Sequence, residues 1–239
     1  MSDHNISSDS VKRLVKDVKQ ALSKDLSKDG IYYKHDQNNM LIGYALIIGN
    51  IDTPYAYGNF LFKFSFPHDY PYSPPAVHYL TNDGKTRFHP NLYKNEKVCL
   101  SILNTWKGEG WTSCQSISSI LITIKSILDD KPLIHEPGIT CKHKDFNIYN
   151  QIIKYKTIET AVIDILSNKI YPEIFELFFN EIIENFNNNY DKILALIPNA
   201  SEIYEIKTSI YRMEVKVDYN KCKKELLKIH KSIKTKIDI

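Results

Sequence analysis

Apolar residues near the start of the chain recur every three to four positions, which is the spacing of one helix face. The pattern predicts a helix over residues 9–27. Asp9 or Ser10 is suited to cap its start, and Gly30 is suited to end it. Its apolar positions are Val11, Leu14, Val15, Val18, Leu22 and Leu26, and its basic face carries Lys12, Lys16 and Lys19.

The pattern changes to alternation in residues 58–66, which predicts a β-strand. A period of two places four phenylalanine rings on one face, and that face needs a helix or another sheet to cover it. Residues 40–49 and 76–80 are further strand candidates. The prolines between residues 66 and 76 favour an extended, rigid loop. The rings are Phe60, Phe62, Phe64 and Phe66, and the prolines are Pro67, Pro71, Pro74 and Pro75.

Residues 81–104 show little periodicity, and a loop of that length inside a compact domain is usually functional. Residues 115–128 then predict a buried helix, because apolar positions again recur at helical spacing. Another loop follows, marked by Pro132 and Pro137.

From about residue 145 onward the pattern is almost wholly helical. We treat residues 166–239 as a helical C-terminal extension. It carries too many large apolar residues for a free tail in water, so we expect it to pack on the rest of the chain or to bind a partner. Among these residues are Phe175, Leu177, Phe178, Phe179, Ile182, Ile183 and Phe186.

Composition excludes several classes of protein. The 239 residues are 43% hydrophobic and 25% charged, so general disorder is not expected. The net charge is +3 and the lysines are dispersed, which argues against a nucleic-acid partner. No apolar run approaches the roughly 20 residues of a membrane span, and the first ten residues lack an apolar signal core. We therefore expect neither a membrane association nor secretion.

The four cysteines, Cys99, Cys114, Cys141 and Cys222, form no close pairs. A disulfide scaffold is therefore not expected, and a reducing compartment, cytoplasmic or nuclear, fits better. A metal site built on His135, Cys141 and His143 would lack a second pair at zinc spacing, so we expect no metal.

The chain becomes chemically specific at His89-Pro90-Asn91, which is followed by Cys99 at the eighth position after the asparagine. Such a tripeptide alone is most often a proline turn. Here it belongs to an ordered series of motifs: Thr53-Pro54-Tyr55, Gly58-Asn59-Phe60, Phe66-Pro67-His68-Asp69-Tyr70-Pro71, Pro74-Pro75, Leu100-Ser101-Ile102-Leu103, Trp106 and Trp111. This series resembles the ubiquitin-conjugating enzymes, and the resemblance covers about residues 10–165.

A narrower likeness is carried by Val98 to Leu103, Thr105-Trp106, Gln115-Ser116-Ile117-Ser118-Ser119 and Glu136-Pro137-Gly138. These motifs resemble one subgroup of that family. This subgroup contains the Z-type conjugating enzymes and the conjugating domain of the giant BIR-repeat apoptosis inhibitor.

The resemblance implies an α/β protein with the UBC fold. Residues 1–165 would form the core: an N-terminal helix, a four-stranded antiparallel sheet, an active-site loop and a covering helix. The implied function is to accept ubiquitin or a ubiquitin-like modifier from an activating enzyme as a thioester on Cys99. The modifier then passes to a substrate lysine or to a ubiquitin ligase. No cofactor is expected on this chain, because the activating enzyme uses the ATP.

The resemblance also implies roles for the residues around Cys99. Asn91 would donate a hydrogen bond to the oxyanion, or hold the loop to a nearby backbone group, or both. His89, with Pro90, would be structural rather than a general base. Trp111 would pack the cysteine loop onto the helix that begins near Gln115.

The group that orients the acceptor lysine is left open between His135 and Glu136. In the family it lies on the loop after the second helix, and that loop is shorter here than in the common single-domain members. Either side chain is able to accept or donate a proton. It is an equal alternative that both are solvated loop residues without a role in the reaction.

Two partner surfaces are implied by the same resemblance. Lys12, Lys16 and Lys19 match the face that meets the activating enzyme, although a run of lysines is usually a solvated helix face. Tyr72, Ser113 and Cys114 match positions that contact ligases. The family's Trp-Ser-Pro-Ala element lacks its proline here, which leaves the choice of ligase open.

Two other functions compete with the enzyme. A papain-like protease also uses cysteine, histidine and asparagine, but its histidine and asparagine lie far downstream of the cysteine, whereas His89 and Asn91 lie just upstream. A non-catalytic UBC-fold adaptor that binds ubiquitin is the more serious alternative. The presence of Cys99 favours the enzyme.

Overall fold

The computed structural model describes residues 6–22, 24–199 and 202–237. The chain begins with helix α1 (Ser8–Ala21), followed by the short helix α2 (Lys24–Lys28). The single helix expected over residues 9–27 is therefore two helices. The cap is also different from the expected one: Ser7 lies before the first turn, and its side chain accepts a hydrogen bond from the backbone N–H of Ser10.

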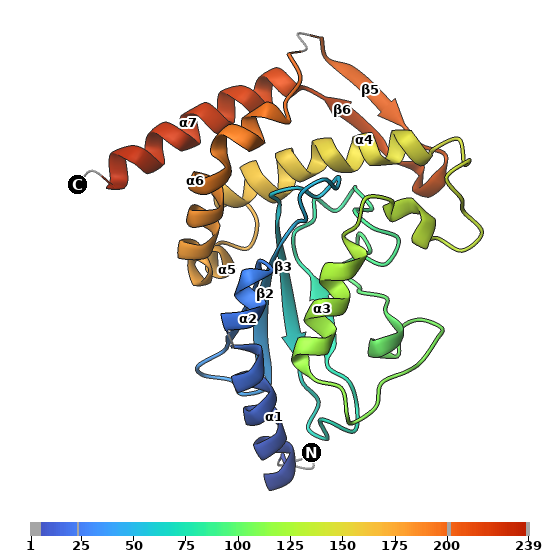
Figure 1. Ribbon diagram of the computed structural model, residues 1–239, viewed down its shortest axis with the longest axis vertical. Helices are drawn as coiled ribbons and strands as arrows, with labels where there is room; N and C mark the ends of the chain where they lie inside the picture. Colours follow the sequence, from blue (N-terminus) through green and yellow to red (C-terminus); the bar gives the residue numbers. More distant parts are fainter. Residues whose placement is uncertain (1–5, 23, 200–201, 238–239) are drawn as a thin grey trace.

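Four antiparallel strands form the central sheet, in the order β1-β2-β3-β4. Figure 1 labels its two middle strands, β2 and β3. They are β1 (Ile31–His35), β2 (Ile42–Ile48), β3 (Asn59–Ser65) and β4 (Ala76–Tyr79). The predicted α/β class with a four-stranded antiparallel sheet is confirmed.

The inner face of the sheet carries the four phenylalanine rings that the alternation predicted, and all four are buried. Helix α3 (Ile117–Ile127) and helix α4 (Phe146–Lys156) contribute the side chains that complete this core. Helix α3 starts at a capping box between Ser116 and Ser119, in which each side chain accepts a hydrogen bond from the other residue's backbone N–H. The helix expected over residues 115–128 is thus confirmed.

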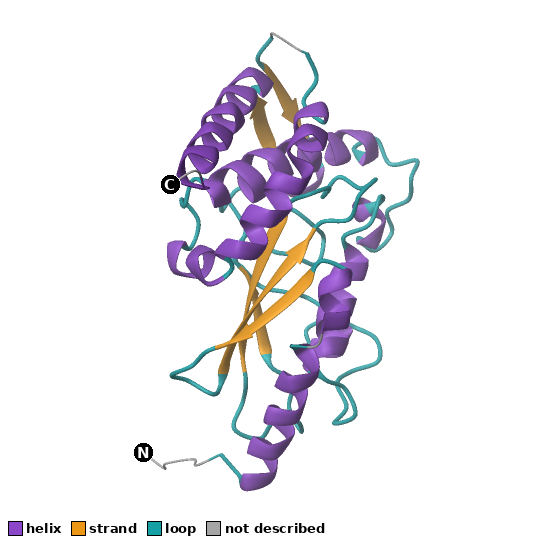
Figure 2. Cartoon of the chain, turned by 60° about the vertical axis from the view of Figure 1, so that its left-hand side comes forward, coloured by secondary structure: helices purple, strands orange, loops and turns teal. Residues whose placement is uncertain are grey.

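The C-terminal segment buries the outer face of the sheet around Leu46 and Leu61, while Ala76 and His78 of β4 stay exposed. Leu46 of β2 and Leu61 of β3 lie opposite each other and are fully buried. They form a second apolar cluster with helix α5 (Pro172–Leu177) and helix α6 (Phe179–Ala195). Figure 2 shows helices on both sides of the strands. We call Ile174, Phe175, Phe178 and Ile182 the outer-face cover.

The rest of the C-terminal segment corrects the expectation that it is almost wholly helical. A π-helical stretch (Thr157–Asp164) continues α4, and the long helix α7 (Tyr219–Ile237) ends the described chain. Between α6 and α7 lies a β-hairpin of β5 (Tyr204–Lys207) and β6 (Glu214–Val217), which Figure 1 shows beside α4. In β6 the valines are buried and Glu214 and Lys216 are exposed, so this short stretch alternates with the period of a strand.

Candidate active site

The cysteine loop, which we define as residues 87–105, brings Cys99 and Asn91 together. Short antiparallel contacts between Leu92 and Val98 fold the chain back on itself. The backbone N–H of Cys99 donates to the Asn91 carbonyl at 2.9 Å, and the Asn91 side-chain amide donates to the Cys99 carbonyl at 2.5 Å. Asn91 and Cys99, which lie eight residues apart in the sequence, are thus in direct contact.

The thiol of Cys99 is covered in this conformation. Its residue is only 2% exposed, and Sγ donates a hydrogen bond to the Thr105 carbonyl at 3.3 Å. The hydroxyl of Thr105 accepts from the backbone N–H of Leu100 and donates to the carbonyl of Val98, both at 2.9 Å. Beside this cover lies an open cleft of about 550 Å³, lined by Asn104, Thr105, Trp106, Lys107 and Pro137.

His89 lies fully buried inside the cysteine loop. Its Nδ1 accepts a hydrogen bond from the backbone N–H of Asn91 at 3.0 Å. Burial holds the pKa of His89 well below its usual value, and the neighbouring His135 and Arg87 lower that pKa further. The ring is therefore neutral with its hydrogen on Nε2, an atom for which we find no hydrogen-bond partner among the described residues. Pro90, also buried, fixes the turn between His89 and Asn91.

The two candidates for orienting the acceptor amine lie at the edge of the same loop. His135 ends a short 3-10 turn, and its ring centroid is 4.8 Å from that of His89. Its Nε2 lies 2.7 Å from a carboxylate oxygen of Asp129, and both side chains are about one-third exposed. Glu136 follows directly and accepts a hydrogen bond from the hydroxyl of Tyr211 in the C-terminal segment.

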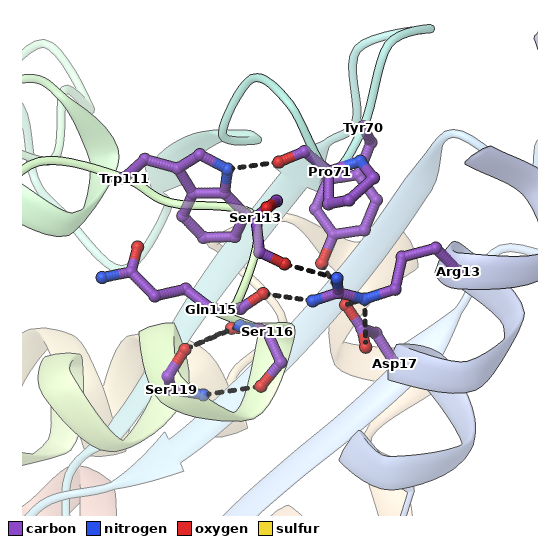
Figure 3. Close-up of polar contacts among 9 residues, drawn as sticks. All are labelled: Arg13, Asp17, Tyr70, Pro71, Trp111, Ser113, Gln115, Ser116 and Ser119. Carbon is purple, nitrogen blue, oxygen red and sulfur yellow. Dashed lines mark hydrogen bonds and ion pairs between the residues drawn. The ribbon is translucent and has the colours of Figure 1, made fainter. Parts of the chain in front are cut away.

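Trp111 ties the cysteine loop to the proline-rich loop. Its backbone N–H donates to the side chain of Asn104 at 2.8 Å. Its indole N–H donates to the carbonyl of Pro71 at 2.7 Å (Figure 3). Its ring also lies 5.9 Å from that of Tyr70. The sequence motif does not indicate this link to the proline-rich loop, and the packing of Trp111 onto the helix that begins near Gln115 stays a prediction.

Arg13 of α1 holds the segment that carries the candidate ligase contacts. Its guanidinium donates to the backbone carbonyls of Ser113 and Gln115, and it forms an ion pair with Asp17 at 3.0 Å (Figure 3). Ser113 and Cys114 are exposed, and Tyr72 on the nearby proline-rich loop is 77% exposed. The structure therefore presents these three residues to solvent on a fixed backbone.

The three lysines proposed for the activating enzyme are all exposed on α1. Lys12 forms a solvent-exposed ion pair with Asp9 at 3.4 Å. Such a pair contributes little to stability, so it leaves the lysine available to a partner. Lys16 and Lys19 lie on the same exposed side of the helix.

Arg87 also holds the cysteine loop, a role that the sequence motifs do not indicate. Its Nε donates to the carbonyl of His89 at 3.2 Å, and one terminal nitrogen donates to the carbonyl of Pro90. Its guanidinium lies over the ring of Tyr93 at 3.2 Å from the centroid. In the sequence, Arg87 is only an arginine two residues before His89, and that position alone does not indicate these contacts.

Among the described residues there is no group of three or more histidine, cysteine, aspartate or glutamate side chains that could hold a metal ion. In the same part of the chain, each helix is too short or too polar to cross a membrane.

Comparison with known proteins gives a family match. The model of the family described as "Ubiquitin-conjugating enzyme" matches residues 13–158. "Ubiquitin-conjugating enzyme E2 Z" of Danio rerio is 45% identical over 144 residues, which are 59% of this chain and 44% of that protein. The human "Dual E2 ubiquitin-conjugating enzyme/E3 ubiquitin-protein ligase BIRC6" is 39% identical over 150 residues, 56% of this chain and 3% of that protein.

A viral relative extends the match further along the chain. "Probable ubiquitin-conjugating enzyme E2 R521" of Acanthamoeba polyphaga mimivirus is 30% identical over 217 residues, which are 74% of this chain and 15% of that protein. The chain spans less than half the length of the E2 Z proteins that it matches. Both members of the subgroup named from the sequence motifs, the Z type and the BIR-repeat protein, are among these relatives.

Proposed function

Because the chain belongs to the ubiquitin-conjugating enzyme family, we propose that it carries ubiquitin or a ubiquitin-like modifier as a thioester on Cys99. The observation that carries this proposal is the direct pairing of Cys99 with Asn91 in the cysteine loop. A thiol carrier suits the task, because a thioester reacts readily with amines and slowly with water.

Loading exchanges one thioester for another. The Cys99 sulfur attacks the carbonyl carbon of the modifier's C-terminal glycine, a new C–S bond forms, and the thiol of the activating enzyme leaves with the proton. In the transfer step an amine nitrogen forms a C–N bond to the same carbon, and the C–S bond breaks. The nitrogen loses one proton, and the leaving thiolate of Cys99 takes up one proton and becomes a thiol again.

Asn91 is proposed to stabilise the oxyanion in the second step. An asparagine amide has two N–H donors, and one of them is used by the Cys99 carbonyl at 2.5 Å. The second donor remains for the negatively charged oxygen that forms next to Cys99. The first bond fixes the amide, so holding the loop and stabilising the oxyanion are compatible roles.

His89 is proposed to support the loop rather than to move a proton. Its buried, neutral ring accepts from the backbone N–H of Asn91. A base whose pKa is held far below neutrality by burial is poorly matched to proton transfer at pH 7. Pro90 and Trp111 are proposed to hold the same loop.

The partners are proposed from the surfaces that stay exposed. Lys12, Lys16 and Lys19 suit an acidic surface of the activating enzyme, and the exposed side chains of Tyr72, Ser113 and Cys114 suit a ligase. A substrate lysine would enter beside Pro137, at the cleft next to Thr105. We propose that the chain binds no cofactor, no nucleic acid and no membrane.

Two further proposals concern organisation and location. We divide the chain into a conjugating core, residues 1–165, and a C-terminal extension, residues 166–239. All four cysteines are free, which supports a reducing compartment, the cytoplasm or the nucleus. A non-catalytic adaptor is not favoured, since Cys99 is present and the named relatives are conjugating enzymes.

The decisive experiment is a charging assay. The protein is incubated with activating enzyme, ATP and a panel of modifiers, and adducts are separated on non-reducing gels. We expect a thiol-sensitive adduct with one modifier. Cys99→Ser should form an ester that resists reductant, while Cys114→Ser, Cys141→Ser and Cys222→Ser should charge normally. Thiol-sensitive charging of the Cys99→Ser protein would contradict the assignment.

A second experiment separates the steps. Asn91→Ala should leave charging largely intact and slow discharge to free lysine by about 10²–10³, the usual effect of losing one oxyanion donor. If charging and discharge fall together, Asn91 only holds the loop.

A further inference from the structure

The C-terminal segment contributes a turn that reaches the cysteine loop. We define residues 208–213, between strands β5 and β6, as the anchored turn. One carboxylate oxygen of the buried Asp145 accepts three hydrogen bonds from it: the backbone N–H and hydroxyl of Ser209 at 2.9 and 2.6 Å, and the backbone N–H of Ile210 at 2.8 Å. Such convergence fixes where the turn begins.

The backbone of the anchored turn is held in an unfavourable conformation. Tyr211 and Arg212 have φ angles of 57° and 47°, in the left-handed region that side chains with a Cβ avoid. The backbone N–H of Thr208 closes the turn on the carbonyl of Met213 at 3.0 Å. Such strain persists only where the surroundings determine the conformation, and it often lies at functional sites.

Tyr211 is the residue that this conformation directs at the active site. Its hydroxyl donates to one carboxylate oxygen of Glu136, and its ring centroid lies 5.0 Å from the guanidinium carbon of Arg87. Its carbonyl accepts from the amine of Lys94 at 3.4 Å. A single residue of the extension therefore contacts both the cysteine loop and the loop that carries Glu136.

A second residue of the anchored turn reaches the same place. The sulfur of Met213 accepts from the backbone N–H of Arg87 at 3.3 Å. Arg87 in turn donates to the carbonyls of His89 and Pro90, directly before Asn91. The anchored turn is thus linked through Arg87 to the backbone directly before Asn91, whose amide is the proposed oxyanion donor.

The chemistry of the contact suits a fixed hydrogen-bond donor. Burial raises the pKa of Tyr211 above its usual value, and the hydrogen bond to Glu136 raises it further. The phenol is therefore protonated throughout the neutral range and always able to donate. It occupies Oε2 of Glu136, while the described residues provide no hydrogen bond to Oε1.

We propose that Tyr211 is a positioning residue for amine transfer. It holds Glu136 by Oε2, so that Oε1 is turned to the incoming amine at the edge of the cleft beside Pro137. This rests on the proposed function, and it assigns the amine-orienting role to Glu136 rather than His135. The extension is then part of the active site, although the family model ends at residue 158.

The test compares Tyr211→Phe with Tyr204→Phe in the full chain. Both variants remove one hydroxyl and keep the ring, but Tyr204 is exposed on β5 of the same hairpin. The protein is charged with ubiquitin, and discharge to free lysine is followed in a single turnover between about pH 7 and pH 9. Melting temperature is measured for each variant.

We expect charging of both variants within about twofold of wild type, and unchanged discharge for Tyr204→Phe. Discharge of Tyr211→Phe should fall by about tenfold at pH 7, the usual value of one hydrogen bond to a charged group. The defect should narrow toward pH 9, because free lysine then needs less help in losing its proton. In a Glu136→Gln background, Tyr211→Phe should cause little further loss.

Three outcomes would overturn the inference. The first is equal discharge by Tyr211→Phe and wild type at every pH. The second is an equal fall in charging, discharge and melting temperature, which indicates a structural role. The third is a full tenfold effect in the Glu136→Gln background. Failure of wild type to charge with any modifier would instead contradict the proposed function itself.

Discussion

Two parts of the C-terminal segment meet the rest of the protein in different ways. The outer-face cover lays buried apolar side chains on Leu46 and Leu61 of the sheet. The anchored turn makes directional polar contacts, from Asp145 at its base to Glu136 at its tip. Burial of apolar surface is non-directional and contributes mainly stability. Hydrogen bonds at fixed angles specify geometry, so the two parts should differ in what their loss does to the enzyme.

The largest effect on stability is expected from the outer-face cover. Phe178→Ala removes a fully buried ring and should lower the free energy of unfolding by about 3–5 kcal/mol. The measurement is urea unfolding at pH 7. Phe179→Ala is the matched control, because Phe179 is 42% exposed and adjacent in sequence. Similar losses for the two variants would show that the sheet does not depend on this cover.

An intermediate effect is expected at the base of the anchored turn. Asp145→Ala leaves two backbone N–H groups without their acceptor and should cost about 1–3 kcal/mol of unfolding free energy. The same variant should slow discharge to lysine more than it slows charging, because Tyr211 is no longer held. A stability loss with normal discharge would separate the turn from the reaction.

The contribution of Asp145 should also depend on pH. Burial by itself would raise the pKa of this carboxyl, but the hydrogen bonds from Ser209 and Ile210 outweigh it and lower the pKa below the ordinary value of 3.8. The unfolded chain therefore binds the proton more tightly, so the contribution is present above pH 3.8 and is lost as the pH falls through the folded value. The stability difference between wild type and Asp145→Ala should shrink on acidification; a constant difference would contradict this.

The smallest effect is expected from the polar rim of the outer-face cover. Lys34 of β1 lies 2.7 Å from Glu181 of α6 and 5.2 Å from the Phe178 ring centroid. Both ionic side chains are partly exposed, so Lys34→Met should change the free energy of unfolding by at most about 1 kcal/mol. High salt should reduce the difference further. A loss as large as that of Phe178→Ala would mean that charge, not apolar burial, holds α6 to the sheet.

Much of the fold follows from local patterns in the sequence. The alternation in residues 58–66 predicts the strand and its buried rings, and helical spacing predicts α3. The sequence pattern does not predict the hairpin of β5 and β6, because each strand is only four residues long and the hairpin lies between strongly helical stretches. The pattern does not predict the burial of the outer face around Leu46 and Leu61 either. Leu61 interrupts the polar side of β3, but nothing local shows that residues 174–182 cover it.

The active site divides in the same way. The pairing of Cys99 with Asn91 involves residues eight apart, so a motif at fixed spacing indicates it. Tyr211 and Glu136 lie 75 positions apart, and Asp145 lies 64 before Ser209. Contacts over such distances depend on the whole fold, and a lone tyrosine in a short hairpin turn has no pattern that points to a carboxylate elsewhere.

The covered thiol of Cys99 has a consequence for redox chemistry. With 2% of the residue exposed and its S–H directed at Thr105, the resting protein offers little to peroxide or alkylating agents. Cys114 and Cys141 are exposed and should be modified first. Thr105 contacts the sulfur, so we expect the segment around Thr105 to move before an electrophile, including the incoming thioester, meets the sulfur. At iodoacetamide concentrations where the labelling rate of Cys99 no longer rises with reagent, that rate equals the rate at which this segment opens in the uncharged protein, and mass spectrometry measures it.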